Sequence, residues 1–176
     1  RDEHWRRGVL LLHKFDLDHA PRQRHGNREV SFLRDQNIAA DQPAGPYEFY
    51  GYVHYPDGTR LGEKEGDEPQ LDPGVLREGE KTYLYTGFCG YGDLSRHGAM
   101  VTVLGEDMLT VERAPEFVAP GGAYAEGSGF EGHAFFEAPS IRKHGDTYYF
   151  VYSSTPMHEL CYATSKDPRQ GFTYGG

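Results

Sequence analysis

Residues 71–75 read Leu-Asp-Pro-Gly-Val, and the run Thr-Tyr-Leu-Tyr follows at residues 82–85. The pattern returns further along the chain, where residues 136–141 read Phe-Glu-Ala-Pro-Ser-Ile and residues 147–150 read Thr-Tyr-Tyr-Phe. The acids of the two copies are 65 positions apart, and so are the threonines that open the two later runs. An equal offset at both ends predicts that the segments are two copies of one structural unit.

The acids of the two copies are Asp72 and Glu137. A repeat that places two carboxylates at matching points can direct both toward a shared axis, as two-carboxylate chemistry requires. Glu137 lies in an apolar setting, between two phenylalanines and an Ala-Pro pair, where desolvation favours the protonated form of a carboxyl group. The structural alternatives are an Asp-Pro turn for the first acid and a solubilising edge-strand charge for the second. We expect the functional interpretation for both.

The chain from residue 44 onward consists of short β-prone runs separated by turns that are rich in Gly, Pro and Asp. Matching hairpin turns are expected at residues 77–80 and 143–146. No stretch combines a sustained helical period with helix caps, so we predict a nearly all-β body. The clearest strand candidates are residues 99–104, 148–153 and 159–164.

A further pair of similar segments indicates the length of the repeat. Residues 43–49 resemble residues 168–174 at an offset of 125, and half of that offset is close to the spacing of the two acids. A unit of about sixty residues with roughly four short strands is typical of a large β-propeller blade. We therefore expect a partial propeller of two to three blades of four-stranded antiparallel sheet. Because so few blades cannot close a ring, we also expect sequence to be missing at both ends.

Residues 1–40 differ in composition from the rest of the chain. They hold 8 Lys/Arg and 6 Asp/Glu, whereas residues 41–176 hold 10 and 21, and all 13 tyrosines follow position 40. We therefore predict an atypical N-terminal segment at residues 1–40 and a partial propeller domain at residues 41–176. A diverged blade or linker accounts for the first part, and so does a reading-frame error upstream of about residue 40.

The net charge of −9 is concentrated in residues 41–176, which argues against a nucleic-acid partner. No apolar run approaches the length of a bilayer-spanning helix, so no membrane partner is expected. Cys89 and Cys161 show no C-x-x-C spacing, and two buried thiols are the expected outcome. The sequence does not fix the localisation of the protein.

In this order and spacing, the motifs at residues 71–87 and 136–154 resemble those of glycoside hydrolase family 43. This family consists of five-bladed propeller glycosidases that act on arabinose- and xylose-containing polysaccharides. The resemblance covers roughly residues 41–176 and includes Tyr-Ala-Thr-Ser at residues 162–165. It implies an all-β, partial five-bladed propeller, and an inverting glycosidase whose partner is a pentose-containing oligo- or polysaccharide.

The resemblance also implies roles for the two acids. Glu137 would be the general acid that protonates the leaving glycosidic oxygen, and Asp72 would be the carboxylate that tunes the pKa of this acid and orients it. The family's general base is an Asp about two blades ahead of Asp72, so it would not lie in this chain. We therefore expect the isolated chain to be inactive and to carry no cofactor. An axial calcium ion would belong to the full-length parent.

Four further residues are candidates for contacting the sugar: His97, Phe136, Arg142 and His158. The alternative for the two histidines is a hydrogen-bonding role in a loop, and for Arg142 it is pairing on a strand face. No pair of histidines shows the spacing of metal ligands, so no metal site is predicted. The competing function is a non-catalytic propeller that binds glycans or proteins, because exposed aromatic rings would serve sugar binding equally well.

Overall fold

A computed structural model describes residues 8–14, 23–25, 28–30, 34–40, 46, 48–90, 92–156 and 159–176. Its strands are β1 (Gly8–Lys14), β2 (Gln23–His25), β3 (Arg28–Val30), β4 (Arg34–Ala40), β5 (Glu48–Tyr52), β6 (Gly74–Glu78), β7 (Lys81–Thr86), β8 (Gly98–Leu104), β9 (Val111–Pro120), β10 (Phe135–His144), β11 (Thr147–Ser154), β12 (Leu160–Ser165) and β13 (Thr173–Tyr174). A short 3-10 turn, η2 (Gly122–Tyr124), follows β9. No helix in the described stretches is long and apolar enough to cross a membrane.

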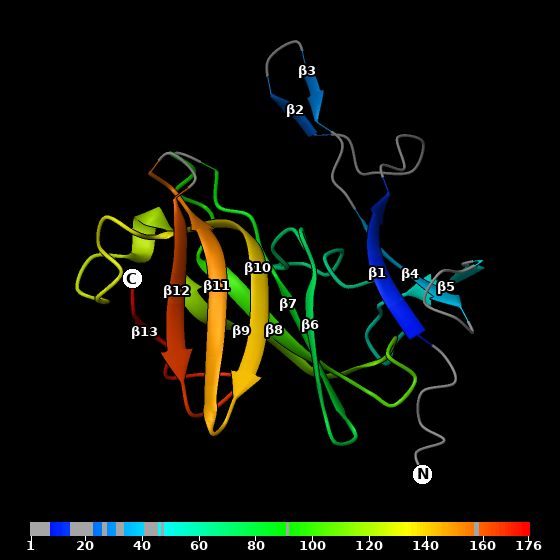
Figure 1. Cartoon of the computed structure of the whole chain (residues 1–176). Coiled ribbons are helices and arrows are strands. Elements are labelled where there is room, and N and C mark those ends of the chain that lie inside the picture. The colour runs from blue at the N-terminus through cyan, green and yellow to red at the C-terminus, as the bar shows by residue number, and fades with distance from the viewer. Residues whose placement is uncertain are drawn as a thin grey trace.

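Two four-stranded antiparallel sheets dominate the structure (Figure 1). Their strand orders are β6-β7-β8-β9 and β10-β11-β12-β13, so each strand pairs with its neighbours in sequence. This up-and-down arrangement is the architecture of a propeller blade. The predicted all-β, partial propeller is confirmed.

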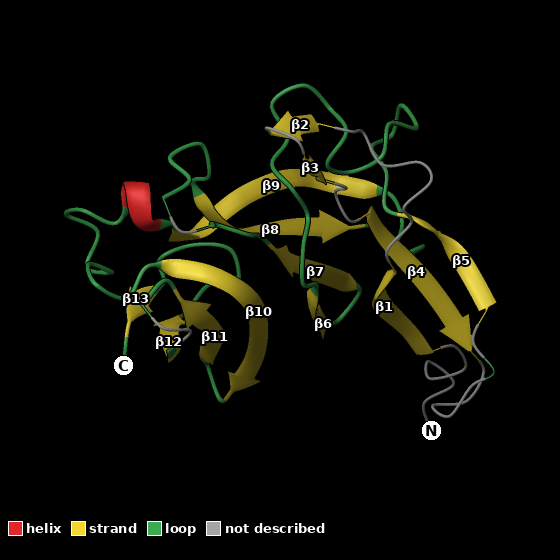
Figure 2. Cartoon of the chain, turned by 90° about the horizontal axis from the view of Figure 1, so that it is seen from above, coloured by secondary structure: helices red, strands yellow, loops and turns green. Residues whose placement is uncertain are grey.

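A third sheet, of order β1-β4-β5, represents part of a preceding unit (Figure 2). Its outer strand β5 starts at Glu48, and the outer strand β13 of the last sheet starts at Thr173. These starts reproduce the offset of 125 residues that the sequence predicts. The ladder between β4 and β5 pairs residues 36–39 with residues 48–52, which lie on opposite sides of the predicted boundary. The division of the chain at that point stays a prediction, as do both explanations of residues 1–40.

The repeat itself is present, but the offset of its backbone is 66 residues and the predicted value of 65 is wrong. Gly79 and Gly145 lie in the two hairpin turns and both have left-handed φ angles, 61° and 56°. Lys81 opens the second strand of the first sheet, and Thr147 opens the second strand of the other. Thr147 therefore corresponds to Lys81 and not to Thr82.

The same shift of one residue changes how the two acids are related. Asp72 corresponds to Ala138, and both have left-handed φ angles, 52° and 58°. Each of them directly precedes a proline. Glu137 comes one residue earlier in its copy, so the two acids are not at equivalent backbone positions. The acids are 65 residues apart, but the strands of the two copies repeat after 66. Aligning the two copies on their acids therefore gave the wrong offset for the backbone.

The two complete sheets share one hydrophobic core. Tyr85 from β7 packs against Phe150 from β11 with ring centroids 5.9 Å apart, and both residues are fully buried. Burial of an aromatic or aliphatic side chain of this size contributes roughly 1.5–3 kcal/mol. The Tyr85 hydroxyl also donates a hydrogen bond to the carbonyl of Pro168 at 2.5 Å. The blades are therefore joined by both apolar packing and a buried polar contact.

The opposite face of the first sheet packs against the segment that follows β5. Val53, Tyr55 and Leu61 from that segment form a second core with Leu84 and Leu104 of β7 and β8. Every residue of β8 is consequently buried. This burial on both faces identifies the β6–β9 sheet as an internal blade with neighbours on two sides.

Candidate active site

Asp72 lies at the entrance to β6 and faces the neighbouring blade. Its Oδ2 atom accepts a hydrogen bond from the backbone N–H of Ala138 at 3.3 Å. Ala138 is the residue directly after Glu137, so the carboxylate of one blade lies against the peptide that follows the acid of the next. The structure thus places the Asp72 carboxylate against the backbone next to Glu137.

Glu137 lies in the first part of β10, where the strand contains a bulge. Glu137 pairs with Ser153 and Ser140 pairs with Val151, which leaves one extra residue on β10 between the two pairs. A bulge of this kind bends a strand and changes the direction of its side chains. Glu137 is half-buried, so the residue stays partly accessible to solvent.

The backbones of β6 and β10 approach each other closely beside the acids. A Cβ atom on Gly74 would lie 2.4 Å from the carbonyl oxygen of Pro139, a distance that no side chain tolerates. Glycine is therefore required at position 74 because of the close approach of the second backbone. The view from above shows β6 and β10 as neighbours, with β9 on the outer side of the first sheet (Figure 2).

Phe136 contacts the neighbouring blade at the junction of β6 and β10. Its carbonyl accepts a hydrogen bond from the N–H of Cys89 at 2.8 Å. Its ring packs on Phe88, with centroids 5.4 Å apart. Both contacts reach the loop after β7, so the residue before Glu137 is held by the neighbouring blade. A contact with substrate remains a prediction for its half-buried ring.

A buried polar network, which was not predicted from the sequence, anchors the segment that leads to Asp72. Gln70 is 3% exposed, accepts a hydrogen bond from the Thr86 hydroxyl at 2.5 Å and donates one to the carbonyl of Glu68 at 2.8 Å. Glu68 is itself buried and accepts from the backbone N–H of His97 at 3.1 Å. These residues lie outside the repeated motif, and their partners Thr86 and His97 are 16 and 29 positions away, so no local pattern identifies them.

His97 lies at the surface above this network. Its Nδ1 atom contacts the Glu68 carboxylate, and its ring stacks on Tyr124 with centroids 4.3 Å apart. Phe117 lies on the same ring at 5.1 Å. These contacts connect His97 to Glu68 and to two exposed rings, and its predicted contact with substrate is not tested.

Arg142 and His158 are the other two residues predicted to contact the sugar. Arg142 is near the hairpin end of β10, paired with Tyr149, and its guanidinium donates to the carbonyl of Ile141 at 2.6 Å. Arg142 lies five positions after Glu137, beyond the bulge in β10. Its predicted contact with the sugar is not tested. His158 lies outside the described residues.

Within the described part of the chain, one group of three side chains has the spacing of metal ligands: His133, Glu159 and Cys161. Its nitrogen and sulfur donors do not fit calcium, which prefers six to eight oxygen ligands. The axial calcium ion stays a prediction for the full-length parent.

No protein-family model matches the chain. A protein of Thermoclostridium stercorarium named xylosidase/arabinosidase is 73% identical over 136 residues, which are 77% of this chain and 29% of that protein. A GH43_1 enzyme of Xanthomonas citri, solved in complex with xylotriose, matches with a TM-score of 0.62 and 25% identity over 83% of this chain and 48% of its own. The chain is part of a glycoside hydrolase family 43 propeller.

The family 43 fold extends beyond the two complete blades. CoXyl43, a GH43 β-xylosidase/α-arabinofuranosidase from a compost microbial metagenome, matches with a TM-score of 0.66 and 20% identity. That match covers 97% of this chain and 53% of CoXyl43. The N-terminal sheet is therefore included in the likeness of fold. The chain spans 29% of the length of its Thermoclostridium relative and about half of the two solved family 43 structures.

Proposed function

We propose that the protein containing this chain is an inverting glycosidase that cleaves xylose- or arabinose-containing oligo- and polysaccharides. The observation that carries the proposal is the hydrogen bond from Ala138 to the Asp72 carboxylate, which joins two adjacent blades beside Glu137. Support for the substrate class comes from the relative named xylosidase/arabinosidase and from the xylotriose complex of the Xanthomonas citri enzyme.

In this proposal Glu137 is the general acid. It donates its proton to the glycosidic oxygen as the bond to the sugar breaks, which avoids the release of an unstable alkoxide. A carboxylate outside this chain activates the attacking water on the opposite face of the sugar. An inverting enzyme holds these two carboxyl groups about 6.5–9.5 Å apart so that the water fits between them.

Asp72 controls the acid without reacting itself. A second carboxylate close to Glu137 disfavours the ionised form of that acid, because two like charges repel each other. The hydrogen bond to Ala138 and the Gln70–Thr86 anchor hold Asp72 at the blade junction. Its proposed role is therefore to keep the acid protonated and to fix the peptide that carries it.

The test uses two substitutions in the full-length protein. Glu137→Gln should lower kcat on xylo-oligosaccharides by about 100- to 10,000-fold. It should affect an aryl xyloside with an acidic phenol leaving group much less, because that group departs without protonation. The alkaline limb of the pH–rate profile should disappear as well, since activity falls with rising pH only while a general acid must stay protonated.

Asp72→Asn separates charge from geometry, because asparagine tolerates the left-handed conformation and can accept the same hydrogen bond from Ala138. It should keep the melting temperature and move the alkaline limb to lower pH. The exposed Glu126→Gln serves as the control and should change neither profile. Full activity of Glu137→Gln on both substrates, with an unchanged pH profile, would refute the acid assignment. Sugar binding by a wild-type protein that hydrolyses nothing would instead support the non-catalytic alternative.

A further inference from the structure

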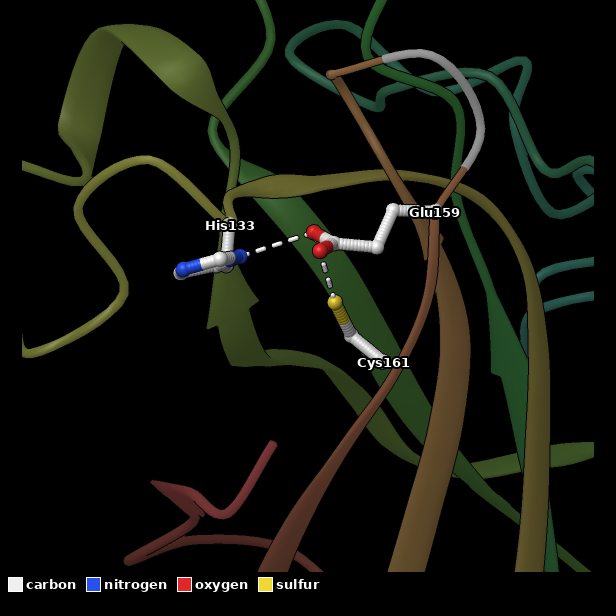
Figure 3. Close-up of side chains that lie close together, drawn as sticks. All are labelled: His133, Glu159 and Cys161. Carbon is white, nitrogen blue, oxygen red and sulfur yellow. Dashed lines mark hydrogen bonds and ion pairs between the residues drawn. The ribbon is translucent and has the colours of Figure 1, made fainter.

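We propose that His133, Glu159 and Cys161 form a binding site for a zinc-class transition metal ion, separate from the two carboxylates of the candidate active site. One ligand atom from each residue lies within 4.8 Å of the other two. The three side chains converge from two segments of the second blade (Figure 3). This inference goes beyond the proposed glycosidase function and does not depend on it.

Two of the three donor atoms already contact the third, a carboxylate oxygen of Glu159. His133 Nδ1 lies 2.7 Å from Glu159 Oε2, and the Cys161 thiol donates to the same oxygen at 3.3 Å. Tetrahedral ligands around zinc, with bonds of about 2.0–2.3 Å, lie about 3.3–3.7 Å apart, so the His133 and Glu159 atoms would separate by less than about 1 Å. An ion can therefore take the place of the shared protons with only small movements of the side chains.

The backbone places these donors at the ends of two strands of one blade. Glu159 directly precedes β12 and Cys161 is the second residue of that strand, and a spacing of two residues is the one that puts side chains on the same face of an extended chain. His133 lies in the turn before β10, where its N–H bonds to the carbonyl of Phe130 at 2.9 Å and its own carbonyl accepts from the Tyr152 hydroxyl at 2.7 Å. The site thus has the positional support that a preformed metal site needs.

The donor types select the class of metal. A nitrogen, a carboxylate oxygen and a thiol sulfur suit zinc and its neighbours in the first transition row, whereas calcium and magnesium require oxygen ligands. The side chains of His133 and Glu159 are 38% and 45% exposed, so an ion can enter from solvent. Cys161 is 1% exposed and closes the inner side. Three protein ligands leave a fourth position for water.

Neighbouring side chains orient the three ligands. The Tyr174 ring stacks on the His133 ring with centroids 4.6 Å apart and an interplanar angle of 12°. The Ser154 hydroxyl donates to Glu159 Oε2 at 3.1 Å. Partners of this kind hold metal ligands in a productive orientation and raise affinity.

The experiment is a titration of the reduced, metal-free full-length protein with Co²⁺, followed by competition with Zn²⁺. We expect one equivalent of Co²⁺ to give the absorption band of a cobalt–thiolate bond, and Zn²⁺ to abolish it. Zn²⁺ should also raise the melting temperature, because the ion binds the folded state and not the unfolded chain.

Matched variants assign the band to this cluster. Cys161→Ser should abolish it, and Glu159→Gln and His133→Asn should each weaken binding by about tenfold or more. Cys89→Ser removes the other buried thiol and should leave the band and the affinity unchanged. Glu159 is half-exposed, so its substitution reports on binding even if a variant of the buried cysteine fails to fold.

Two results would overturn the proposal. One is the absence of a thiolate band and of any Zn²⁺-dependent rise in melting temperature for the wild-type protein. The other is a band that survives Cys161→Ser or that disappears equally in Cys89→Ser.

Discussion

Asp72 and Ala138 both hold a left-handed backbone conformation immediately before a proline. This conformation costs roughly 1–2 kcal/mol for a residue with a side chain, and a following proline restricts the choice further. Such strain persists only where surrounding contacts hold it in place. Here the contacts are the hydrogen bond between the two residues and the close approach of Gly74 to Pro139. The strain is therefore concentrated where the first strands of two blades meet.

Two threonines of the first blade provide a stability test at the scale of single residues. Thr102 is fully buried, and its hydroxyl has no hydrogen-bond partner within the described structure. Thr102→Val should stabilise the full-length protein by about 1 kcal/mol, because it removes a polar group that is buried without a partner. The measurement is the free energy of unfolding from urea denaturation.

Thr86→Val is the matched control, since Thr86 is equally buried but its hydroxyl donates to Gln70. This substitution leaves the buried amide oxygen of Gln70 without its donor and should destabilise the protein by about 1–3 kcal/mol. Two changes of the same sign would show that the hydrogen bond makes no difference.

At the scale of elements, the strands could be predicted because the pattern of residues within each short run is enough to indicate a strand. In β11 the side chains alternate between half-buried and buried from Thr147 to Ser154, which is the two-residue period that the tyrosine-rich sequence displays. The turns at Gly79 and Gly145 follow from local composition in the same way. The two thiols were also correctly predicted as buried.

The register and the supporting contacts could not be predicted from the sequence. No feature of the amino-acid composition predicts the bulge beside Glu137. Aligning the two copies on their acids therefore gave an offset that is one residue too short. The Gln70–Thr86 hydrogen bond and the His133–Glu159 contact join residues that are 16 and 26 positions apart. Such pairs become visible only when the blades are folded and packed.

An ion-pair network between the blades makes stability depend on pH. Glu78 of β6 accepts hydrogen bonds from Lys143 of β10 and from the Tyr148 hydroxyl of β11. The hydrogen bond from Lys143, followed by that from Tyr148, lowers the pKa of Glu78 below its ordinary value of 4.5. A carboxylate whose pKa is lowered on folding stabilises the protein above the unfolded pKa and loses this contribution as pH falls through the folded pKa.

Glu78→Gln should therefore lower the melting temperature at pH 7 and reduce its decline below about pH 4.5. Glu80→Gln, an exposed carboxyl in the adjacent turn, is the control and should leave the curve close to that of the wild type. The measurement is the melting temperature as a function of pH. Parallel curves for Glu78→Gln and the wild type would contradict a stabilising ion pair between the blades.

At the scale of the whole molecule, the described residues form two four-stranded blades, the three-stranded β1-β4-β5 sheet and the two-stranded β2-β3 sheet. We predict that residues 1–176 alone release no sugar from xylo-oligosaccharides, because the general base is proposed to lie outside them. The unpaired strands at the ends of such an assembly should also promote association. Comparison with the full-length protein, by product analysis and size-exclusion chromatography, tests both statements. A monodisperse, cooperatively melting monomer with hydrolase activity would contradict them.

The hydrogen bond from Tyr85 to the carbonyl of Pro168 has a consequence for dissecting the protein into modules. Pro168 lies after β12, in the connection to β13, yet its acceptor serves a tyrosine of the preceding blade. Excising a module at Ser165 would leave that phenol unsatisfied in the interior of its neighbour. The smallest transplantable unit is therefore a sheet together with the connection contributed by the next one, and shuffling between homologues should cut beyond Pro168.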